Sequence, residues 1–274
     1  MDKWLALINH AWRWCGTAFS FFIFGLGGIV LPLIAVPILF CIPGSLEQRE
    51  KRAQAVIHNS FRFYIGMMRF LGVLSYEVEN IEKLRNAQLI LANHPSLIDV
   101  IFLIALVPNA NCVVKGKLVR NPFTRGPIKT AGYIINDNSE EVITAASAAV
   151  TKGHALIIFP EGTRTTPGKG LALKRGAANV AIRATADITP VLIDCYPTTL
   201  TKQDRWYQVP DKKVHFRIQV NETIPVAPYQ QLSAPSVGAR KLTTDLTEYF
   251  NKELTLYERS AARNQTDDYR CARS

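Results

Sequence analysis

The chain has 274 residues, which suits one large domain with an appendage and is ample for a packed core. Its 32 basic and 22 acidic residues give a net charge of +10. The basic residues are scattered and match no zinc-finger, basic-zipper or RNA-recognition pattern, which argues against a nucleic-acid-binding protein. The five cysteines are isolated and form no C-x-x-C pair, which argues against a disulfide framework or a structural zinc site.

An uncharged segment near the N-terminus covers residues 14–46, and its core, residues 17–42, is long enough to cross or deeply enter a bilayer. Pro32 and Pro37 lie inside this core, and each removes a helical hydrogen bond and bends the helix. Basic residues flank the segment similarly on both sides, so the positive-inside rule gives no polarity. We expect a bent, re-entrant anchor with both ends in the cytoplasm, and a single straight span is the alternative.

The next segment, residues 53–74, has the pattern of a basic amphipathic helix, with Arg62 and Arg69 among aromatic and aliphatic side chains. Such a helix either lies in the membrane interface or packs against the domain that follows it. The pattern fits both interpretations equally. Residues 1–74 are therefore predicted to form a membrane-anchoring helical region.

Beyond residue 74, short apolar runs alternate with helical stretches. The predicted strands are residues 76–78, 89–92, 111–114, 133–135, 155–159, 188–193 and 214–220. The predicted helices are residues 97–106, 139–152, 175–186 and 233–257. This alternation predicts an α/β fold over residues 75–259, with a mixed, largely parallel sheet flanked by helices. The polar, Arg-rich segment 260–274 is predicted to be a disordered tail.

A histidine stands directly after the buried strand predicted at 89–92, in the run Asn93-His94-Pro95-Ser96. Pro95 ends the strand ladder, and Ser96 is predicted to cap the helix that follows. Asp99 then falls in the first helical turn, where it can reach His94 Nδ1 and leave Nε2 facing a cleft. An imidazole oriented by a carboxylate is a general base near neutral pH. The structural alternative is a strand-end histidine hydrogen-bonded to a helix-capping aspartate.

A second motif, Phe159-Pro160-Glu161-Gly162-Thr163-Arg164, follows another apolar run. It combines a carboxylate, a Gly-centred turn and a guanidinium. A turn with free N–H groups beside an arginine suits an anionic oxygen. A base together with an anion site indicates transfer of a group to a substrate hydroxyl. The chain has no G-x-S-x-G elbow, which argues against a serine hydrolase.

The two motifs in this order resemble the glycerolipid acyltransferase family, whose best-known members are 1-acylglycerol-3-phosphate acyltransferases. The family's H-x-x-x-x-D motif corresponds to His94 and Asp99, and its F-P-E-G-T-R is present unaltered at residues 159–164. Residues 188–191 match its proline-bearing strand, and residues 174–177 match its K-x-G-A. The resemblance covers residues 75–221, and bacterial members commonly carry hydrophobic N-terminal helices.

The resemblance implies that His94 takes the proton of the acceptor hydroxyl while Asp99 orients the imidazole. The donor is then an acyl thioester of acyl carrier protein or coenzyme A, with no metal and no prosthetic group, and amides near Gly162 stabilise the oxyanion. The implied substrate-binding residues lie on the two loops and one strand end: Asn93, Ser96, Lys115, Glu161, Gly162, Thr163 and Arg164. Arg164 would hold an anionic acceptor group. The implied location is the bacterial inner membrane, with the catalytic domain on the cytoplasmic face.

One position departs from the family pattern. The second family motif ends in Asp-Arg, whereas here Asp137 is followed by Asn138. An amide in place of the arginine loses a charge-assisted hydrogen bond to phosphate of about 1.5–3 kcal/mol. Nearby cations that would compensate are Lys115, Lys117, Arg120 and Arg125, of which Lys115 fits the motif best.

This departure leaves the acceptor open. Besides lysophosphatidate, the candidates are a pigment lipid, as in the aryl-polyene-associated branch of the family, an ornithine lipid or a glycolipid. A further alternative is a non-catalytic lipid-binding protein that kept the fold. The presence of His94, Asp99, Glu161 and Arg164 together argues against this last interpretation, because a scaffold has no need of all four.

Overall fold

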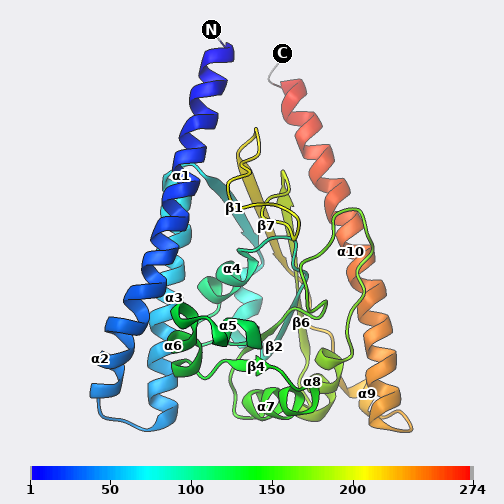
Figure 1. The fold of residues 1–274 in the computed structure, drawn as a ribbon. Helices are drawn as coiled ribbons and strands as arrows, with labels where there is room; N and C mark the ends of the chain where they lie inside the picture. The colour runs from blue at the N-terminus through cyan, green and yellow to red at the C-terminus, as the bar shows by residue number, and fades with distance from the viewer. Residues whose placement is uncertain (1, 272–274) are drawn as a thin grey trace.

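The computed structural model describes residues 2–271, with side chains from residue 3 to residue 257. A seven-stranded sheet in the order β1-β7-β6-β2-β5-β3-β4 forms its centre (Figure 1). The strands are β1 (Leu74–Glu79), β2 (Leu89–Ala92), β3 (Asn111–Lys115), β4 (Ile134–Asn136), β5 (Leu156–Ile158), β6 (Ile188–Tyr196) and β7 (Val214–Val220). All neighbours pair in parallel except β6 and β7. The predicted mixed, largely parallel sheet is therefore confirmed.

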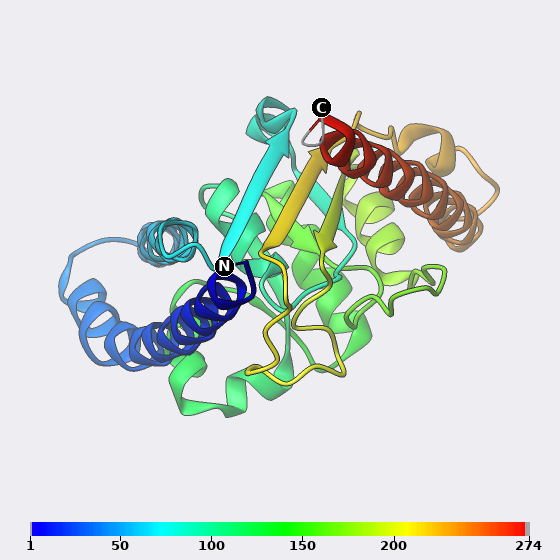
Figure 2. The ribbon, with the colours of Figure 1, turned by 90° about the horizontal axis from the view of Figure 1, so that it is seen from above.

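Helices cover both faces of this sheet. They are α1 (Asp2–Val30), α2 (Val36–Cys41), α3 (Leu46–Phe70), α4 (Asp99–Leu106), α5 (Gly116–Arg120), α6 (Pro122–Thr130), α7 (Ser139–Thr151), α8 (Gly176–Ala184), α9 (Ala227–Gln230) and α10 (Pro235–Cys271). Seen from above, α1 and α10 lie on opposite sides of the sheet (Figure 2). Two apolar clusters follow from this layering, one toward α3 and α4 and the other toward α7, α8 and α10.

Strand β2 shows why its sequence is apolar without alternation. Ile90 and Ala92 belong to the cluster under α3 and α4, whereas Leu89 and Leu91 belong to the cluster under α8 and α10. A parallel strand covered on both faces buries every side chain, so a continuous apolar run is the expected pattern. Because β2 is central, the residues that follow it are held in a fixed position.

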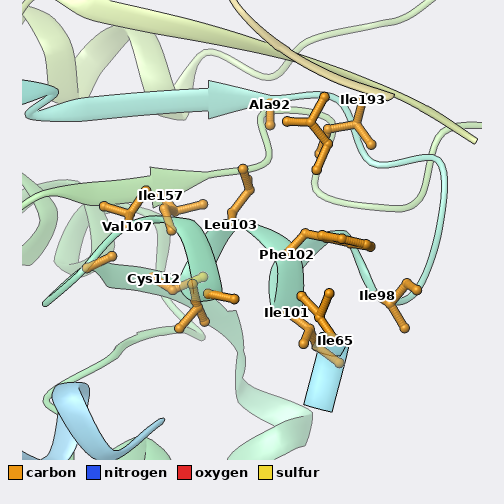
Figure 3. Packing of buried hydrophobic residues seen from close by; sticks show 14 of the residues in the cluster. Ile65, Ala92, Ile98, Ile101, Phe102, Leu103, Val107, Cys112, Ile157 and Ile193 are labelled. Atoms are coloured by element: carbon orange, nitrogen blue, oxygen red, sulfur yellow. The ribbon is translucent and has the colours of Figure 1, made fainter. Parts of the chain in front are cut away.

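Helix α4 is packed between α3 and the sheet. Figure 3 shows Phe102 and Leu103 of this helix among Ile157 of β5 and Ile193 of β6. Phe102 is 1% exposed. This packing fixes the first turn of α4, which carries Asp99, relative to the end of β2.

At the N-terminus, α1 continues through a π-helical turn, Leu31–Ala35, into α2. Pro32 and Pro37 lie in the first turns of these two segments, and the helix continues through both, since Val30 and Ala35 keep helical backbone angles. After residues 42–45 the chain reverses and α3 runs beside α1 (Figure 1). Within the described residues, Lys3–Cys41 is long and apolar enough to cross a membrane by length and composition, and little of its most apolar window is buried.

Several sequence expectations differ from the structure. The helix predicted at 53–74 is α3, which begins at Leu46 and ends at Phe70, and Leu74 begins β1. Ala53, Ile57 and Ile65 on α3 are buried and the helix packs on α4, so the packing interpretation is the one that the structure supports. Helices α5, α6 and α9 were not predicted, because they are short and contain proline or glycine.

The C-terminal segment also differs from the expected disordered tail. Helix α10 continues without interruption to Cys271, so residues 260–271 have helical backbone, and residues 272–274 lie outside the described residues. Ala261, Ala262, Arg263 and Gln265 are helix-favouring residues that allow this extension.

Candidate active site

The two sequence motifs meet at the carboxyl ends of β2 and β5, which are parallel neighbours. Parallel strands that end at one edge bring their following loops together, and this edge is the usual ligand site of α/β sheets. The loops are joined directly: Thr165 N–H donates to the His94 carbonyl at 2.7 Å, and His94 N–H donates to Thr165 Oγ1 at 3.0 Å. The structure therefore holds the two motifs as one unit.

His94 and Asp99 form the expected pair. The His94 Nδ1 to Asp99 Oδ2 distance is 2.9 Å, and the Asp99 side chain is completely buried while that of His94 is 18% exposed. With the Nδ1 proton directed at the carboxylate, the neutral ring leaves Nε2 as the basic atom. Nε2 forms no hydrogen bond within the described part of the chain. The ring also lies against Phe159, with centroids 4.4 Å apart.

Burial raises the pKa of the Asp99 carboxyl, and its hydrogen bond to His94 and the Ser96 N–H act in the opposite direction. The Arg164 charge also lowers this pKa. Ser96 N–H donates to Asp99 Oδ2 at 2.7 Å, so this one oxygen is hydrogen-bonded to both Ser96 and the His94 ring. A carboxylate in this setting fixes the tautomer of the imidazole and stabilises it when protonated.

The predicted cap of α4 is wrong. Ile98 occupies the N-cap position and makes no side-chain cap bond, and Ser96 contributes only its backbone N–H to Asp99. Ser96 Oγ is buried and has no hydrogen-bond partner among the described residues. Ser96 lies two residues before the N-cap position, so its hydroxyl does not serve as the cap.

Glu161 links the two loops. Its Oε1 accepts hydrogen bonds from Thr165 Oγ1 at 2.6 Å and from the His94 N–H at 3.2 Å. Burial raises the pKa of the Glu161 carboxyl, against the lowering effect of these hydrogen bonds. The side chain thus supports the backbone of His94, in addition to any contact with a substrate.

Gly162 adopts a left-handed conformation with φ +66°, which favours glycine at the centre of this turn. Its N–H donates to the Phe159 carbonyl at 3.0 Å. The turn itself therefore uses the Gly162 N–H, and the expectation that amides near Gly162 stabilise an oxyanion stays a prediction. Thr163 is exposed beside Gly162.

Arg164 reaches away from its own loop to the connection between β6 and β7. Its Nη1 donates to the carbonyls of Leu200 and Thr201, both at 2.7 Å. Leu200 also accepts the Leu97 N–H at 3.1 Å, so its carbonyl joins Arg164 to the loop after His94. The other guanidinium N–H groups form no hydrogen bond among the described residues and remain donors for an anionic group.

Two further predicted site residues have different surroundings. The Asn93 amide is buried and pairs with Ile193 of β6, donating to its carbonyl at 2.7 Å and accepting its N–H at 2.8 Å. Lys115 is exposed at the carboxyl end of β3, where α5 begins. Asn93 therefore holds the end of β2 against β6, whereas the Lys115 ammonium is available to solvent at the site's edge of the sheet.

Asn138, the residue that departs from the family pattern, caps α7. Its Oδ1 accepts the Glu140 N–H at 3.2 Å and its Nδ2 donates to Glu141 Oε1 at 2.9 Å. Residue 136 of β4 pairs with Lys115, so Asn138 follows the strand that borders this lysine. The side chain is exposed.

An apolar cavity of about 950 Å³ lies beside the His94 loop. The sequence pattern did not predict it. Leu97 and Ile98 of the His94 loop and Leu200 lie in its wall. Its other walls come from α1, α3, α5, α6 and the β6–β7 loop. No group of three or more His, Cys, Asp or Glu side chains in the described residues is arranged to hold a metal ion.

The fold and the site together define an α/β protein with an oriented histidine beside an apolar cavity. Residues 75–194 match the Acyltransferase family. The chain is similar in fold to the 1-acyl-sn-glycerophosphate acyltransferase PlsC of Thermotoga maritima, with a TM-score of 0.62, 20% identity, and coverage of 93% of this chain and 98% of that one. Residues 75–194, which carry the two motifs, are therefore similar to the acyltransferase family, as the motifs indicated.

Curated relatives include two bacterial proteins named 1-acyl-sn-glycerol-3-phosphate acyltransferase. The Helicobacter pylori protein is 33% identical over 125 residues, which are 42% of this chain and 53% of that protein. The Pseudomonas aeruginosa protein is 28% identical over 147 residues, which are 51% of this chain and 57% of that protein. The chain therefore matches somewhat more than half of the length of each.

Proposed function

We propose that the chain is a membrane-bound O-acyltransferase that moves an acyl group from a thioester to the hydroxyl of a lysolipid. The observation that carries the proposal is the His94–Asp99 pair, with Nε2 unengaged, on the loop whose Leu97 and Ile98 line an apolar cavity. The names of the relatives make 1-acylglycerol-3-phosphate the leading acceptor. The donor is acyl carrier protein or coenzyme A carrying the acyl chain.

In the proposed reaction, His94 Nε2 takes the proton of the acceptor hydroxyl, and the hydroxyl oxygen forms a bond to the thioester carbonyl carbon. Collapse of the tetrahedral intermediate breaks the C–S bond. The imidazolium then gives its proton to the departing thiolate. Asp99 holds the ring and stabilises its charge throughout. The thioester is already activated, so we expect the reaction to need neither a metal nor a prosthetic group.

We assign the acceptor's anionic group to Arg164, whose Nη1 is held by the Leu200 and Thr201 carbonyls and whose other N–H groups are not engaged by the described residues. Lys115 supplies a second cation at the same edge of the sheet. The acyl chain is assigned to the cavity, whose lining is almost wholly apolar.

The membrane attachment is assigned to α1, the following π-helical turn and α2. Large apolar side chains along this segment face outward, with Trp4 72% and Leu33 70% exposed. Side chains of this kind are stable in lipid rather than in water. We place the protein at the bacterial inner membrane with the catalytic domain on the cytoplasmic side, where acyl carrier protein and coenzyme A thioesters are made.

A second candidate is acylation of an acceptor without a phosphate monoester, such as a pigment lipid, an ornithine lipid or a glycolipid. The observation that favours it is Asn138, whose amide caps α7 where the family pattern has an arginine. A neutral side chain here lowers the positive charge that a phosphate would meet.

The test is acyl transfer by the purified full chain in lipid nanodiscs. Thioesters of acyl carrier protein and of coenzyme A are each offered with lysophosphatidate, other lysophospholipids, and ornithine- and sugar-based acceptors, and products are identified by mass spectrometry. Acylated lysophosphatidate as the main product supports the leading candidate, and preference for a phosphate-free acceptor supports the second. Absence of transfer to every acceptor, with folded protein, contradicts the proposed function.

A further inference from the structure

A basic segment runs from β3 through α5 and α6 to β4 and contains no carboxylate from residue 111 to residue 136. Its five cations are all exposed: Lys115, Lys117, Arg120, Arg125 and Lys129. None of the five forms an ion pair within the part of the chain that the structure describes. Unpaired like charges repel one another, so their concentration on two short helices favours a partner that carries negative charge.

Apolar side chains stand among these cations. Leu118 of α5 is 43% exposed and Phe123 of α6 is 50% exposed. Pro122, Arg125 and Lys129 recur at spacings of three and four residues, so they share one face of α6. Cations mixed with exposed aromatic and aliphatic side chains are typical of an element that lies in the headgroup layer of a bilayer. We call α5, α6 and their exposed side chains the α5–α6 surface.

The α5–α6 surface is continuous with the apolar N-terminal segment. Helix α6 packs against α1, the π-helical turn and α2 (Figure 1). The contacts are close: a Cβ on Gly28 would lie 3.3 Å from Phe123 Cβ, and one on Gly126 would lie 3.0 Å from Pro32 Cβ. Because α6 touches the apolar segment at Gly28 and Pro32, a bilayer that receives this part of the segment also meets α6.

Both elements border the same cavity. Leu118, Asn121 and Phe123 line it from the α5–α6 side, and Phe24, Gly27 and Leu31 line it from the N-terminal segment. A lipid chain that moves between the bilayer and the cavity therefore passes the junction of these two elements. Cations at this junction are placed to hold the surface of the bilayer against the entrance.

We propose that the α5–α6 surface binds anionic phospholipid headgroups and seats the cavity entrance on the bilayer. This proposal depends on one part of the proposed function, the attachment of the protein to a membrane. It places a basic membrane contact on a different element from residues 53–74, for which the sequence fitted membrane contact and packing equally and which the structure packs against α4. An acidic carrier protein would also be attracted by the charge, but the exposed Leu118 and Phe123 and the continuity with the anchor favour lipid.

The experiment uses the unmodified full chain in nanodiscs of phosphatidylcholine, with or without phosphatidylglycerol. A water-soluble amine-acetylating reagent is added, and the acetylation rate of each lysine is read by mass spectrometry. Lys117 and Lys129 report on the surface, and Lys169 and Lys252 are internal controls on the loop after Arg164 and on α10. We expect phosphatidylglycerol to slow acetylation of the first pair several-fold, to leave the second pair unchanged, and to lose its effect at high salt.

Equal rates for Lys117 and Lys129 with and without phosphatidylglycerol would overturn the proposal. Slowing that appears only when acyl carrier protein is added would assign the surface to that protein instead. The variant R120Q/R125Q/K129Q should lose the slowing at Lys117, whereas the charge-matched control K169Q/R240Q/K252Q should keep it. No substrate is present, so failure of this test and failure of acyl transfer are separate outcomes.

Discussion

Arg13 of α1 donates a 2.7 Å hydrogen bond to the carbonyl of Pro210, a residue 197 positions away in the β6–β7 loop. The Arg13 side chain is 4% exposed, and its guanidinium also donates to the Asp211 carbonyl and to Asn9 Oδ1. Phe21 of α1 adds an aromatic contact with Trp206 of the same loop. The N-terminal helix is therefore fastened to the loop whose carbonyls hold Arg164.

We expect Arg13→Met to destabilise the protein, because it leaves two loop carbonyls without a donor at a buried position. The cost is about 1–3 kcal/mol, and it appears as a lower Tm in one detergent. The acceptor KM should rise as well, since the loop that positions Arg164 is less restrained. Arg13→Lys should recover part of both effects, and Arg240→Met, at an exposed position of α10, is the control. An unchanged Tm would contradict the fastening role.

His94→Ala should lower kcat for acyl transfer by about 10²–10⁴-fold, because it removes the base while the loop remains held through the His94 backbone. The measurement is product formation in nanodiscs together with thermal unfolding. His154→Ala, a histidine outside the site, should keep full activity. Activity of the His94 variant within tenfold of the original enzyme, with an unaltered melting curve, would refute the base assignment.

Asp99→Asn tests orientation rather than proton transfer. An amide at this position can direct its N–H₂ toward the ring, which favours the tautomer that protonates Nε2 and removes the base. We expect a loss in kcat of up to about 10⁴-fold with a smaller change in KM. The pH dependence of kcat is the second readout. A large change in KM with kcat retained would show that Asp99 contacts the acceptor instead.

Glu161→Gln should show how burial of a carboxylate affects stability. Burial raises the pKa of Glu161 above its ordinary value of 4.5, so the folded state binds this proton more tightly than the unfolded state. As pH rises from 4.5 toward the raised pKa, ionisation of Glu161 therefore lowers the free energy of unfolding. Above the raised pKa this loss of stability stays constant. Relative to the original chain, the Gln variant should gain Tm at neutral pH, and this gain should shrink on acidification. A pH-independent difference in Tm would contradict the argument.

Most of the correct predictions of the fold and the site came from the strand pattern and the two motifs. The predicted strands at 89–92 and 214–220 coincide with β2 and β7 at both ends, because apolar runs and regular alternation identify fully and partly buried strands. The His94–Asp99 pair was predicted from spacing alone, since a strand end followed by a helix start brings residues five positions apart together.

Other features depend on contacts that spacing does not encode. The hydrogen bonds of Asn93 with Ile193 and of Arg164 with Leu200 join segments 36 to 100 residues apart. Local pattern also failed at α6, where Pro122 starts the helix and Pro127 lies inside it. The cavity is formed by side chains from α1, α3, α6 and the β6–β7 loop, so it exists only in the folded chain.

The last prediction concerns Asn138. Replacing it with arginine removes the cap of α7, which should lower stability by about 0.5–2 kcal/mol and therefore reduce Tm. The same change places a guanidinium beside the strand pair that carries Lys115, so we expect KM for lysophosphatidate to fall several-fold. Asn138→Ala is the matched control, because it loses the same cap without adding charge. Equal KM values for Asn138→Arg and Asn138→Ala would show that position 138 does not border the acceptor. If Asn138→Arg also lowers activity toward a phosphate-free acceptor while it improves the use of lysophosphatidate, the natural acceptor is the phosphate-free one.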